Sequence, residues 1–387
     1  MENFITSIYV ENSRNIKDLE IKLSDEKRQH LILTGKNGSG KTSLLEEIYR
    51  ELLHYTYELN SFDLDTIEAG YKKPKPNIKV KFPLVEGITY GEHYKKWISG
   101  EFLLVLFPAI RPNLKHVLNI PSGIKKVYLE RQVFFSDKTN KDFVQYILNL
   151  KADRSFAKDD NKIETVKNID NWFDNLQTQL AQIFDVDKLE LHFDRDTYNF
   201  NIIIKDREPF NFYQLSDGYS AIIDIITELL LRMDAHNAKI YDLEGIVLID
   251  EIETHLHVDL QKKILPFLTA FFPKIQFIVT THSPFVLSSI SNATICDLET
   301  KIVTSDLSAY SYGALIESYF EVDEYSQEIK DYIKEYEQLT MLFNPTDEEN
   351  ARLRFLKDYF AHAPKYLSKE LLLKLNQIEL NELLKSH

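Results

Sequence analysis

The stretch Gly35–Thr42 constrains this chain more than any other part of its sequence. It reads GKNGSGKT and fits the pattern G-x-x-x-x-G-K-[ST] at every fixed position. An apolar run at 31–33 precedes it, and residues 43–49 follow with helical spacing. The order strand, glycine-rich turn and helix directs backbone N–H groups and a helix N-terminus at phosphate oxygens. The sequence therefore predicts a phosphate-binding loop; the alternative is a chance match in an ordinary glycine turn.

The residue types within this loop suggest individual roles. Lys41 would reach the β- and γ-phosphates of a nucleotide, and the Thr42 hydroxyl would ligate Mg²⁺. The predicted nucleotide-binding residues of the loop are Lys36, Asn37, Gly38, Ser39, Gly40, Lys41, Thr42 and Ser43.

Composition limits the class of protein. A chain of 387 residues forms one large domain or two to three ordinary ones. Cys296 is the single cysteine, which excludes a disulfide framework or a cysteine-based zinc site within one chain and fits a reducing cytosol. The longest apolar runs, at 102–110 and 264–272, are too short to span a bilayer. We therefore expect a soluble, cytoplasmic protein without a membrane partner.

Charge is distributed unevenly along the chain. The net charge of −14 argues against a protein that coats nucleic acid over its whole surface. Residues 71–131, however, contain twelve Lys or Arg against four Glu, a local charge of +8, with Lys72, Lys73 and Lys75 near its start. This segment predicts either a patch that follows nucleic-acid phosphates or a solvated insertion face.

Further elements are predicted from periodicity and turn residues. Strand-like spacing occurs at 4–10, 18–23, 126–132, 188–193 and 198–205, with a turn at 11–15, and helical spacing covers 140–184. Prolines at 74, 76, 83, 108, 112 and 121 predict short strands and loops between 56 and 125.

A second candidate anion site lies at 214–220. There, Ser216 and Gly218 form a Ser-x-Gly turn before an apolar, helix-like run at 222–233. Backbone amides and a hydroxyl at such a helix start could face an anion. The same residues also fit an ordinary turn and N-cap.

Two carboxylates follow a buried strand predicted at 246–249. Because ligands of open α/β sheets bind beyond the carboxyl ends of the strands, Asp250 and Glu251 are placed to act on a nucleotide. Asp250 would hold Mg²⁺, and Glu251 would position or activate the attacking water. The alternative is that Asp-Glu merely starts the next loop.

Histidines follow these strands as well. A strand at 276–280 leads to His282, which could donate a hydrogen bond to a γ-phosphate oxygen, although a lone histidine there is usually structural. His255 and His257 have i, i+2 spacing and so point in different directions in a strand or a helix. They are not predicted to form a metal pair.

Taken in order, these four stretches resemble the nucleotide-binding head of the ABC-type ATPases, in particular the branch with the SMC, Rad-fifty and overcoming-lysogenisation-defect (OLD) proteins. Gly35–Thr42 resembles Walker A, 215–219 the signature, 246–251 Walker B, and His282 the switch histidine. Residues 250–257 resemble the DEPE-HLHP style of the OLD-like branch, with Ile252 and Val258 in place of the prolines. The resemblance covers roughly residues 1–300.

The resemblance implies an α/β fold: a P-loop ABC-type head with a mixed, largely parallel sheet and an antiparallel β subdomain. The head would span 1–304 with a helical insertion at about 56–185, followed by a helical assembly region at 305–387. Helices are expected at 314–320, 327–342, 347–360 and 367–384. Between Lys41 and Ser216 there are no sustained heptads, so no long SMC-like arm is expected.

In the family, two heads enclose two ATP molecules. The resemblance implies Lys41, Glu251 and His282 as catalytic residues, and Thr42 and Asp250 as Mg²⁺ ligands. Ser216 and Gly218 would contact the γ-phosphate bound by the opposite protomer. An ATPase that forms a homodimer around ATP, or a higher oligomer, is therefore expected. The signature departs from the transporter form at Asp217 and Tyr219, and Gln132 is the one candidate for the glutamine loop.

The stretch 312–320 and the acidic helices after it resemble the C-terminal part of Septu-type and retron-associated defence ATPases, which work with a separate HNH nuclease. The expected function is an ATP-dependent switch that controls a nuclease or toxin partner in bacterial anti-phage defence. One alternative is a DNA-repair or chromosome-maintenance ATPase of RecF or SMC type that binds DNA directly. Another is a stand-alone OLD-like effector with a nuclease site within 56–200.

Overall fold

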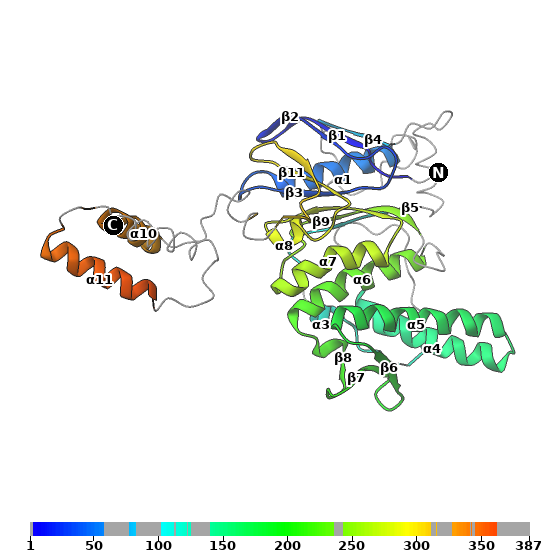
Figure 1. The fold of residues 1–387 in the computed structure, drawn as a ribbon. Coiled ribbons are helices and arrows are strands. Elements are labelled where there is room, and N and C mark those ends of the chain that lie inside the picture. Colours follow the sequence, from blue (N-terminus) through cyan, green and yellow to red (C-terminus); the bar gives the residue numbers. More distant parts are fainter. Residues whose placement is uncertain are drawn as a thin grey trace. The chain divides into compact units, whose positions relative to one another are not determined.

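A six-stranded sheet lies in the middle of the first of two structural units, Met1–Tyr312 and Gly313–His387 (Figure 1). The computed structural model describes residues 3–57, 77–82, 102–111, 114–121, 123–124, 140–235, 243–310, 315, 327–340, 342 and 345–361. The strand order of the sheet is β12-β11-β3-β10-β9-β5. Its strands are β3 (His30–Thr34), β5 (Phe102–Phe107), β9 (Glu244–Ile249), β10 (Ile275–Thr280), β11 (Ala293–Asp297) and β12 (Val303–Ser305).

All neighbouring strands of this sheet are parallel except β12, which pairs antiparallel with β11. Strands β3, β9 and β10 lie in the middle and are almost entirely buried, as expected for parallel strands covered on both faces. Their carboxyl ends meet at one edge of the sheet. The predicted α/β fold with a largely parallel sheet is confirmed.

Helix α1 (Lys41–Tyr57) packs between this sheet and a second, antiparallel sheet (Figure 1). The second sheet contains β1 (Ser7–Ser13), β2 (Ile16–Lys22) and β4 (Ile78–Lys81), in the order β2-β1-β4. Leu44, Leu45 and Ile48 of α1 join the core that both sheets share. Full burial of each such side chain contributes about 1.5–3 kcal/mol. Because β1 continues to Ser13, the turn before β2 is shorter than the predicted 11–15.

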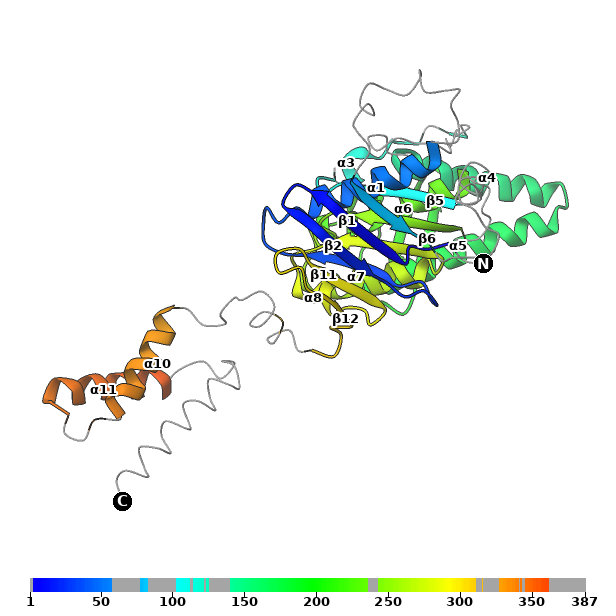
Figure 2. The same cartoon turned by 90° about the horizontal axis from the view of Figure 1, so that it is seen from above.

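The opposite face of the six-stranded sheet is covered by helices (Figure 1). They are α6 (Asp217–Ala235) and α7 (Val258–Phe271), with the pair α4 (Phe143–Asp159) and α5 (Ile163–Phe184) beside them. In Figures 1 and 2 the α4–α5 pair extends beyond the sheet. A third, antiparallel sheet adjoins this pair and consists of β6 (Leu189–Asp194), β7 (Asn199–Ile204) and β8 (Phe210–Asn211).

Short helical turns connect these elements: α3 (Leu114–Val117), η1 (Asn140–Asp142), η2 (Phe212–Gln214) and α8 (Pro284–Leu287). Helix α6 begins at Asp217, earlier than the predicted 222, because the Ser220 N–H already donates to the Ser216 carbonyl over 2.8 Å. The predicted strand at 126–132, including Gln132, lies outside the described residues.

The second unit contains α10 (Gln327–Thr340) and α11 (Asp347–Ala361), which pack on each other through Ile333, Tyr336 and Leu356. Arg352 of α11 forms a bidentate ion pair with Glu335 of α10, with both N–O distances 2.8 Å. The predicted helices at 327–342 and 347–360 are present. Those predicted at 314–320 and 367–384 lie outside the described residues, apart from Leu315. Among the described helices, none is long and apolar enough to cross a membrane.

Candidate nucleotide-binding site

The turn between β3 and α1 adopts backbone conformations that need glycine. Gly35 has φ +131° and Gly40 has φ +100°, values that side chains other than glycine rarely allow. A Cβ on Gly35 would also lie 2.9 Å from the Ser39 Oγ, and one on Gly40 would lie 3.3 Å from the Ile16 side chain. The predicted order of strand, glycine turn and helix is therefore present, as β3, residues 35–40 and α1.

Lys41 is folded over this turn. Its Nζ donates to the carbonyl oxygens of Gly35 over 2.8 Å and Lys36 over 3.1 Å, and only 6% of the residue is exposed. Burial lowers the pKa of Lys41, while the nearby carboxylates of Glu251 and Asp250 act in the opposite direction. An ammonium held by two carbonyls at the loop can exchange them for phosphate oxygens, which form stronger, charge-assisted hydrogen bonds.

The other predicted residues of the loop differ in exposure. Lys36, Asn37 and Gly38 are exposed at the tip of the turn, Ser39 and Gly40 are half-buried, and Ser43 is buried in α1. The Lys36 ammonium forms an ion pair of 2.9 Å with Glu299. The tip of the loop is thus accessible to a ligand, while its base is anchored in the core.

A hydrogen bond joins the start of α1 to the end of β9. The Thr42 Oγ1 donates to Asp250 Oδ2 over 2.8 Å, and the Thr280 Oγ1 donates to Asp250 Oδ1 over 2.5 Å. Asp250 is 3% exposed, and its N–H is paired with the Phe107 carbonyl of β5. Hydroxyl and carboxylate oxygens are the ligands that Mg²⁺ prefers. Thr42 and Asp250 therefore fit the predicted role of Mg²⁺ ligands.

Glu251, next along the chain, has a left-handed backbone with φ +44°. Such a conformation costs a residue other than glycine about 1–3 kcal/mol and persists only where its surroundings hold it. Here its N–H donates to the Thr280 Oγ1 over 2.7 Å and its carbonyl accepts from Arg111 Nη2 over 3.1 Å. Thr254 Oγ1 donates to Glu251 Oε2 over 3.4 Å, and the residue is half-buried. The carboxyl group is thus held beside Asp250.

His282 lies at the end of the neighbouring strand, β10. Its N–H donates to Glu253 Oε1 over 2.5 Å, and the Thr281 N–H donates to the Leu33 carbonyl over 3.0 Å. Burial, together with the positive charge of Lys41, lowers the pKa of His282. Its imidazole is therefore neutral at neutral pH and keeps one ring N–H donor. That one donor is sufficient for the predicted hydrogen bond to a phosphate oxygen.

Ser216 and Gly218 lie in a different part of the head. They lie where α6 begins, with Ser216 just before the helix and Gly218 in its first turn, and α6 covers the face of the sheet opposite α1 (Figure 1). Ser216 is exposed, whereas Gly218 is buried with Leu260 Cδ1 3.0 Å from the position of a Cβ. Asp217 pairs with Lys115 over 2.7 Å, and Tyr219 stacks on Phe184 with ring centroids 4.4 Å apart. The turn at 216–219 thus contacts α3 through Lys115, α5 through Phe184 and α7 through Leu260.

Sequence reasoning missed three residues of this site: Thr280, Glu253 and Arg111. Arg111 is 6% exposed and donates to the carbonyls of Pro108, Asp250 and Glu251. The positive charge predicted for 71–131 included Arg111 and Lys115. In the structure, Arg111 donates to backbone carbonyls and Lys115 pairs with Asp217. Lys72, Lys73 and Lys75 lie outside the described residues. A signal for Arg111 was its place just after the apolar run that forms β5.

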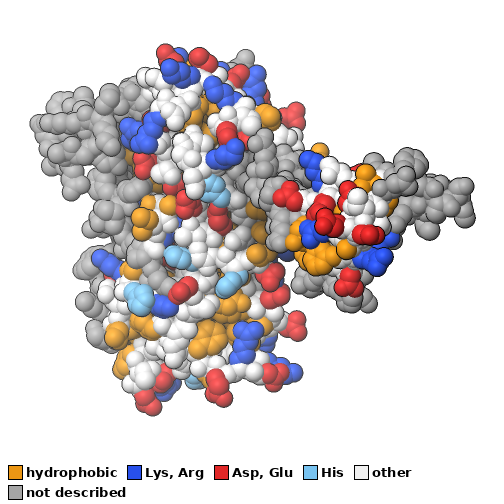
Figure 3. Space-filling view, turned by 90° about the vertical axis from the view of Figure 1, so that its left-hand side faces the viewer, with side chains coloured by type: hydrophobic (Ala, Val, Ile, Leu, Met, Phe, Trp, Pro, Cys, Tyr) orange, Lys and Arg blue, Asp and Glu red, His pale blue; other side chains and the backbone are white. Residues whose placement is uncertain are grey.

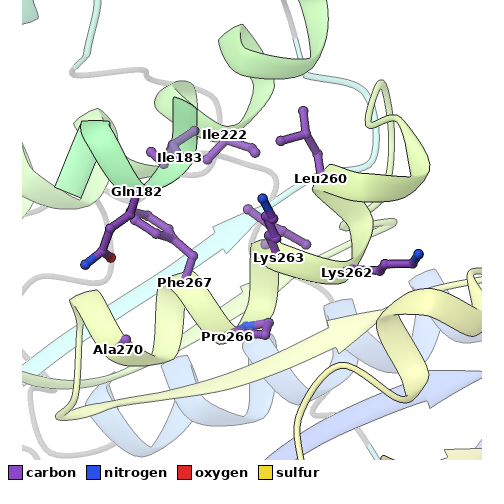
Figure 4. A pocket seen from close by; sticks show the side chains of 10 residues that line it. Gln182, Ile183, Ile222, Leu260, Lys262, Lys263, Pro266, Phe267 and Ala270 are labelled. Carbon is purple, nitrogen blue, oxygen red and sulfur yellow. The ribbon is translucent and has the colours of Figure 1, made fainter. Parts of the chain in front are cut away.

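Two surface features of the molecule are considered beside the site. On the face of the molecule drawn in Figure 3, histidine and acidic side chains gather in the middle. A pocket of about 290 Å³ opens between α5, α6 and α7 (Figure 4), and its lining includes Ile183, Ile222, Leu260, Lys262, Lys263 and Phe267. None of the predicted site residues lines this pocket. The candidate nucleotide site is therefore the P-loop edge of the sheet rather than this apolar pocket.

Comparison with known proteins gives three kinds of match. A family model described as "AAA domain, putative AbiEii toxin, Type IV TA system" matches residues 48–288, more than half of the chain. The Septu protein PtuA of Bacillus mycoides (strain KBAB4) is 26% identical over 306 residues, which cover 75% of this chain and 39% of PtuA. The retron Ec83 probable ATPase of Escherichia coli is 25% identical over 383 residues, covering 75% of this chain and 70% of that protein.

Among solved structures, an Smc head domain with an extended coiled coil, bound to the C-terminal domain of ScpA derived from Pyrococcus furiosus, matches with a TM-score of 0.40. It is 15% identical and covers 78% of this chain and 96% of that chain. The chain spans about two fifths of the length of the PtuA relative. The predicted resemblance to Septu-type and retron-associated ATPases is confirmed by the sequence matches.

Proposed function

Since the chain belongs to the family described as "AAA domain, putative AbiEii toxin, Type IV TA system", we propose that it binds ATP with Mg²⁺ and hydrolyses ATP to ADP and phosphate. The observation that carries this proposal is the hydrogen-bonded set at the sheet edge, in which Thr42, Thr280 and Glu251 are arranged around the Asp250 carboxylate. One relative is itself named a probable ATPase.

Each side chain of the set has a role that its position supports. Lys41 binds the β- and γ-phosphates, and the backbone N–H groups of 36–40 surround them. Thr42 and Asp250 hold Mg²⁺, which when bound neutralises charge on the phosphates. Glu251 orients the attacking water and accepts its proton, and neutral His282 donates to a γ-phosphate oxygen.

The proposal includes a homodimer that encloses ATP, or a higher oligomer built from it. Ser216 is exposed at the N-terminus of α6, a place suited to a phosphate. The residues next to Ser216 contact α3, α5 and α7 rather than the P-loop of the same chain. We therefore propose that Ser216 and Gly218 bind a nucleotide held by the P-loop of a second copy. ATP then stabilises the dimer because it binds both surfaces, and hydrolysis releases them.

The cellular role that we propose is regulation of a separate effector, a nuclease or toxin, in bacterial anti-phage defence. The matches to Septu PtuA and to a retron ATPase support this role, as does the acidic C-terminal unit with its two packed helices. Direct binding of nucleic acid through 71–131 is a further part of the proposal. A RecF- or SMC-type repair ATPase and a stand-alone nuclease are the competing functions.

The test of the ATPase proposal compares the purified wild-type chain with Glu251→Gln. Wild type should release phosphate from Mg-ATP, whereas the variant should keep ATP affinity and lose turnover, because only the group that activates water changes. Light scattering in Mg-ATP should then show a trapped dimer for the variant. A variant that stays monomeric would contradict the ATP-enclosed dimer, and wild-type turnover in the variant would contradict the role of Glu251.

A cleavage assay separates the regulator from the stand-alone nuclease. The purified chain with ATP and Mg²⁺ should leave plasmid, linear DNA and tRNA intact. Cleavage that survives purification and is lost on mutation within 56–200 would favour the nuclease. Charge reversal at Lys72, Lys73 and Lys75 should weaken DNA binding and its salt dependence if that segment contacts phosphates. Unchanged affinity would remove nucleic-acid binding at 71–131 from the proposal.

A further inference from the structure

Arg111 connects the end of β9 to the segment that follows β5. Its Nη1 donates to the carbonyls of Pro108 over 3.0 Å and Asp250 over 2.8 Å, and its Nη2 donates to the carbonyl of Glu251 over 3.1 Å. The planar guanidinium thus holds two consecutive carbonyls, one on each side of the point where the backbone turns left-handed. This arrangement fixes the direction in which the Glu251 side chain leaves the chain.

Burying this charge is costly, and acidic groups around it compensate in part. Removing a guanidinium from water is unfavourable unless anions and hydrogen bonds offset it. Burial lowers the pKa of Arg111, and among the acidic groups that oppose this effect the largest contribution comes from Asp224. Asp224 is 1% exposed and belongs to α6, the helix that begins at the Ser216 turn.

Asp224 is held in turn by a buried polar network. The Asn140 side-chain amide donates to Asp224 Oδ1 over 2.8 Å, and the Asn140 N–H donates to Glu228 Oε2 over 2.9 Å. The Arg232 Nε donates to Glu228 Oε1 over 2.7 Å. Asn140 and Glu228 are 0% and 2% exposed. These residues therefore form a buried polar network at α6, the helix that follows the signature turn.

One donor of Arg111 is left over. Among the described residues, the buried Nε–H of Arg111 has no hydrogen-bond partner. An unpaired buried donor is unfavourable, and the fold nevertheless keeps the guanidinium at this position.

We propose that Arg111 is a positioning residue, which orients Glu251 by holding the backbone carbonyls of Asp250 and Glu251. This role rests on the proposed function, since it presupposes that Glu251 acts on ATP.

The experiment compares Arg111→Met with Arg232→Met in the full chain, because Arg232 is a second largely buried arginine, which pairs with Glu228 in α6 rather than with the Glu251 backbone. Phosphate release gives kcat, a fluorescent ATP analogue gives nucleotide affinity, and thermal unfolding gives stability. Arg111→Met should lower kcat at least tenfold with affinity within about threefold of wild type. Arg232→Met should lower the melting temperature with kcat within about twofold of wild type.

Equal losses of kcat in Arg111→Met and Arg232→Met would overturn the positioning role.

Should Arg111→Met fail to fold, Arg111→Lys decides the matter. Lysine keeps the charge but lacks the planar fork that holds two carbonyls, so kcat should fall while the protein stays folded. If Arg111→Lys kept the wild-type kcat while Glu251→Gln abolished turnover, the proposed role of Arg111 would be overturned and the proposed function would stand. Normal turnover in Glu251→Gln would instead overturn the proposed function itself.

Discussion

The P-loop side and the signature side of the candidate site are built in different ways. On the P-loop side, Thr42, Asp250, Thr280 and Glu251 are joined by hydrogen bonds of 2.8, 2.5 and 2.7 Å within one chain. On the signature side, Ser216 is exposed, and the contacts around it involve its neighbours Asp217, Gly218 and Tyr219. The side chains of the P-loop side are therefore hydrogen-bonded to one another without a ligand, whereas the Ser216 side chain of the signature side is exposed.

This difference indicates a division of labour. Groups that are already oriented do not have to reorganise during a reaction, which is why such sites stabilise developing charge efficiently. An exposed serine at a helix start can instead meet a ligand carried on another surface. We therefore expect changes on the P-loop side to affect binding and chemistry within one chain. Changes on the signature side should affect only steps that require two chains.

The largest expected effect is on nucleotide binding in Lys41→Ala. Loss of the buried ammonium should weaken Mg-ATP binding at least 100-fold, about 2.7 kcal/mol, measured by titration calorimetry. Lys162→Ala is the control, because the exposed Lys162 ammonium pairs with Asp160 outside the candidate site. It should stay within about threefold of wild type. Equal effects of the two lysines would contradict the assignment of Lys41.

Ser216→Arg should come next and act on hydrolysis alone. The bulky, charged side chain should block docking of a second copy, lowering kcat about 100-fold while ATP affinity stays within about threefold of wild type. Ser155→Arg, at an exposed position of α4, serves as the control and should leave kcat unchanged. Normal hydrolysis by Ser216→Arg would remove the signature turn from the site and with it the contrast between the two sides.

Acid should weaken the scaffold beneath the P-loop side. His30 begins β3, its Nδ1 accepts from the Phe277 N–H over 3.1 Å, and burial, with a smaller effect of Arg28, lowers its pKa from 6.5 to about 4. Between these pKa values the unfolded chain binds more protons, so stability is full above the unfolded value of 6.5 and falls as the pH drops towards 4.

Between pH 7.5 and 5 this histidine should cost the wild type about 2 kcal/mol of unfolding free energy. The measurement is urea unfolding at both pH values, in wild type and in His30→Asn. Asparagine keeps an acceptor near the Nδ1 position but does not titrate. The same pH dependence in both proteins would show that another group is responsible.

The smallest effect is expected for Thr280→Val. Valine keeps the branched shape and removes the hydroxyl that bridges Asp250 and the Glu251 N–H, so kcat should fall about tenfold. Thr281→Val provides the control, because that buried hydroxyl accepts from the Ser283 N–H instead. A similar loss in both variants would mean that this part of β10 matters for packing rather than for holding the two carboxylates.

The sequence predicted the parts of the site that local order determines. Three parts of the site come directly after a recognisable strand: Gly35–Thr42, Asp250 and His282. Because parallel strands end at one edge of the sheet, these parts are expected to lie together. Arg111 and Thr280 could not be found in this way. Their roles depend on β9 lying between β5 and β10, a pairing of segments far apart in the chain.

The left-handed backbone of Glu251 was also beyond sequence reasoning, because glutamate has no preference for it. Charge counting failed at Arg111 and Lys115 for a related reason. The sum over 71–131 treats all basic residues alike, whereas the fold buries one of these two and pairs the other with Asp217. The contribution of a charged residue is decided by its three-dimensional surroundings.

The conformation of Glu251 has a consequence for how this protein can change. Glycine at position 251 would relieve the strained φ of +44°, and a screen for thermal tolerance would therefore enrich such replacements. Each of them would discard the carboxyl group proposed to act on water. If Glu251 has that role, selection for robustness and selection for turnover act in opposite directions at a single codon.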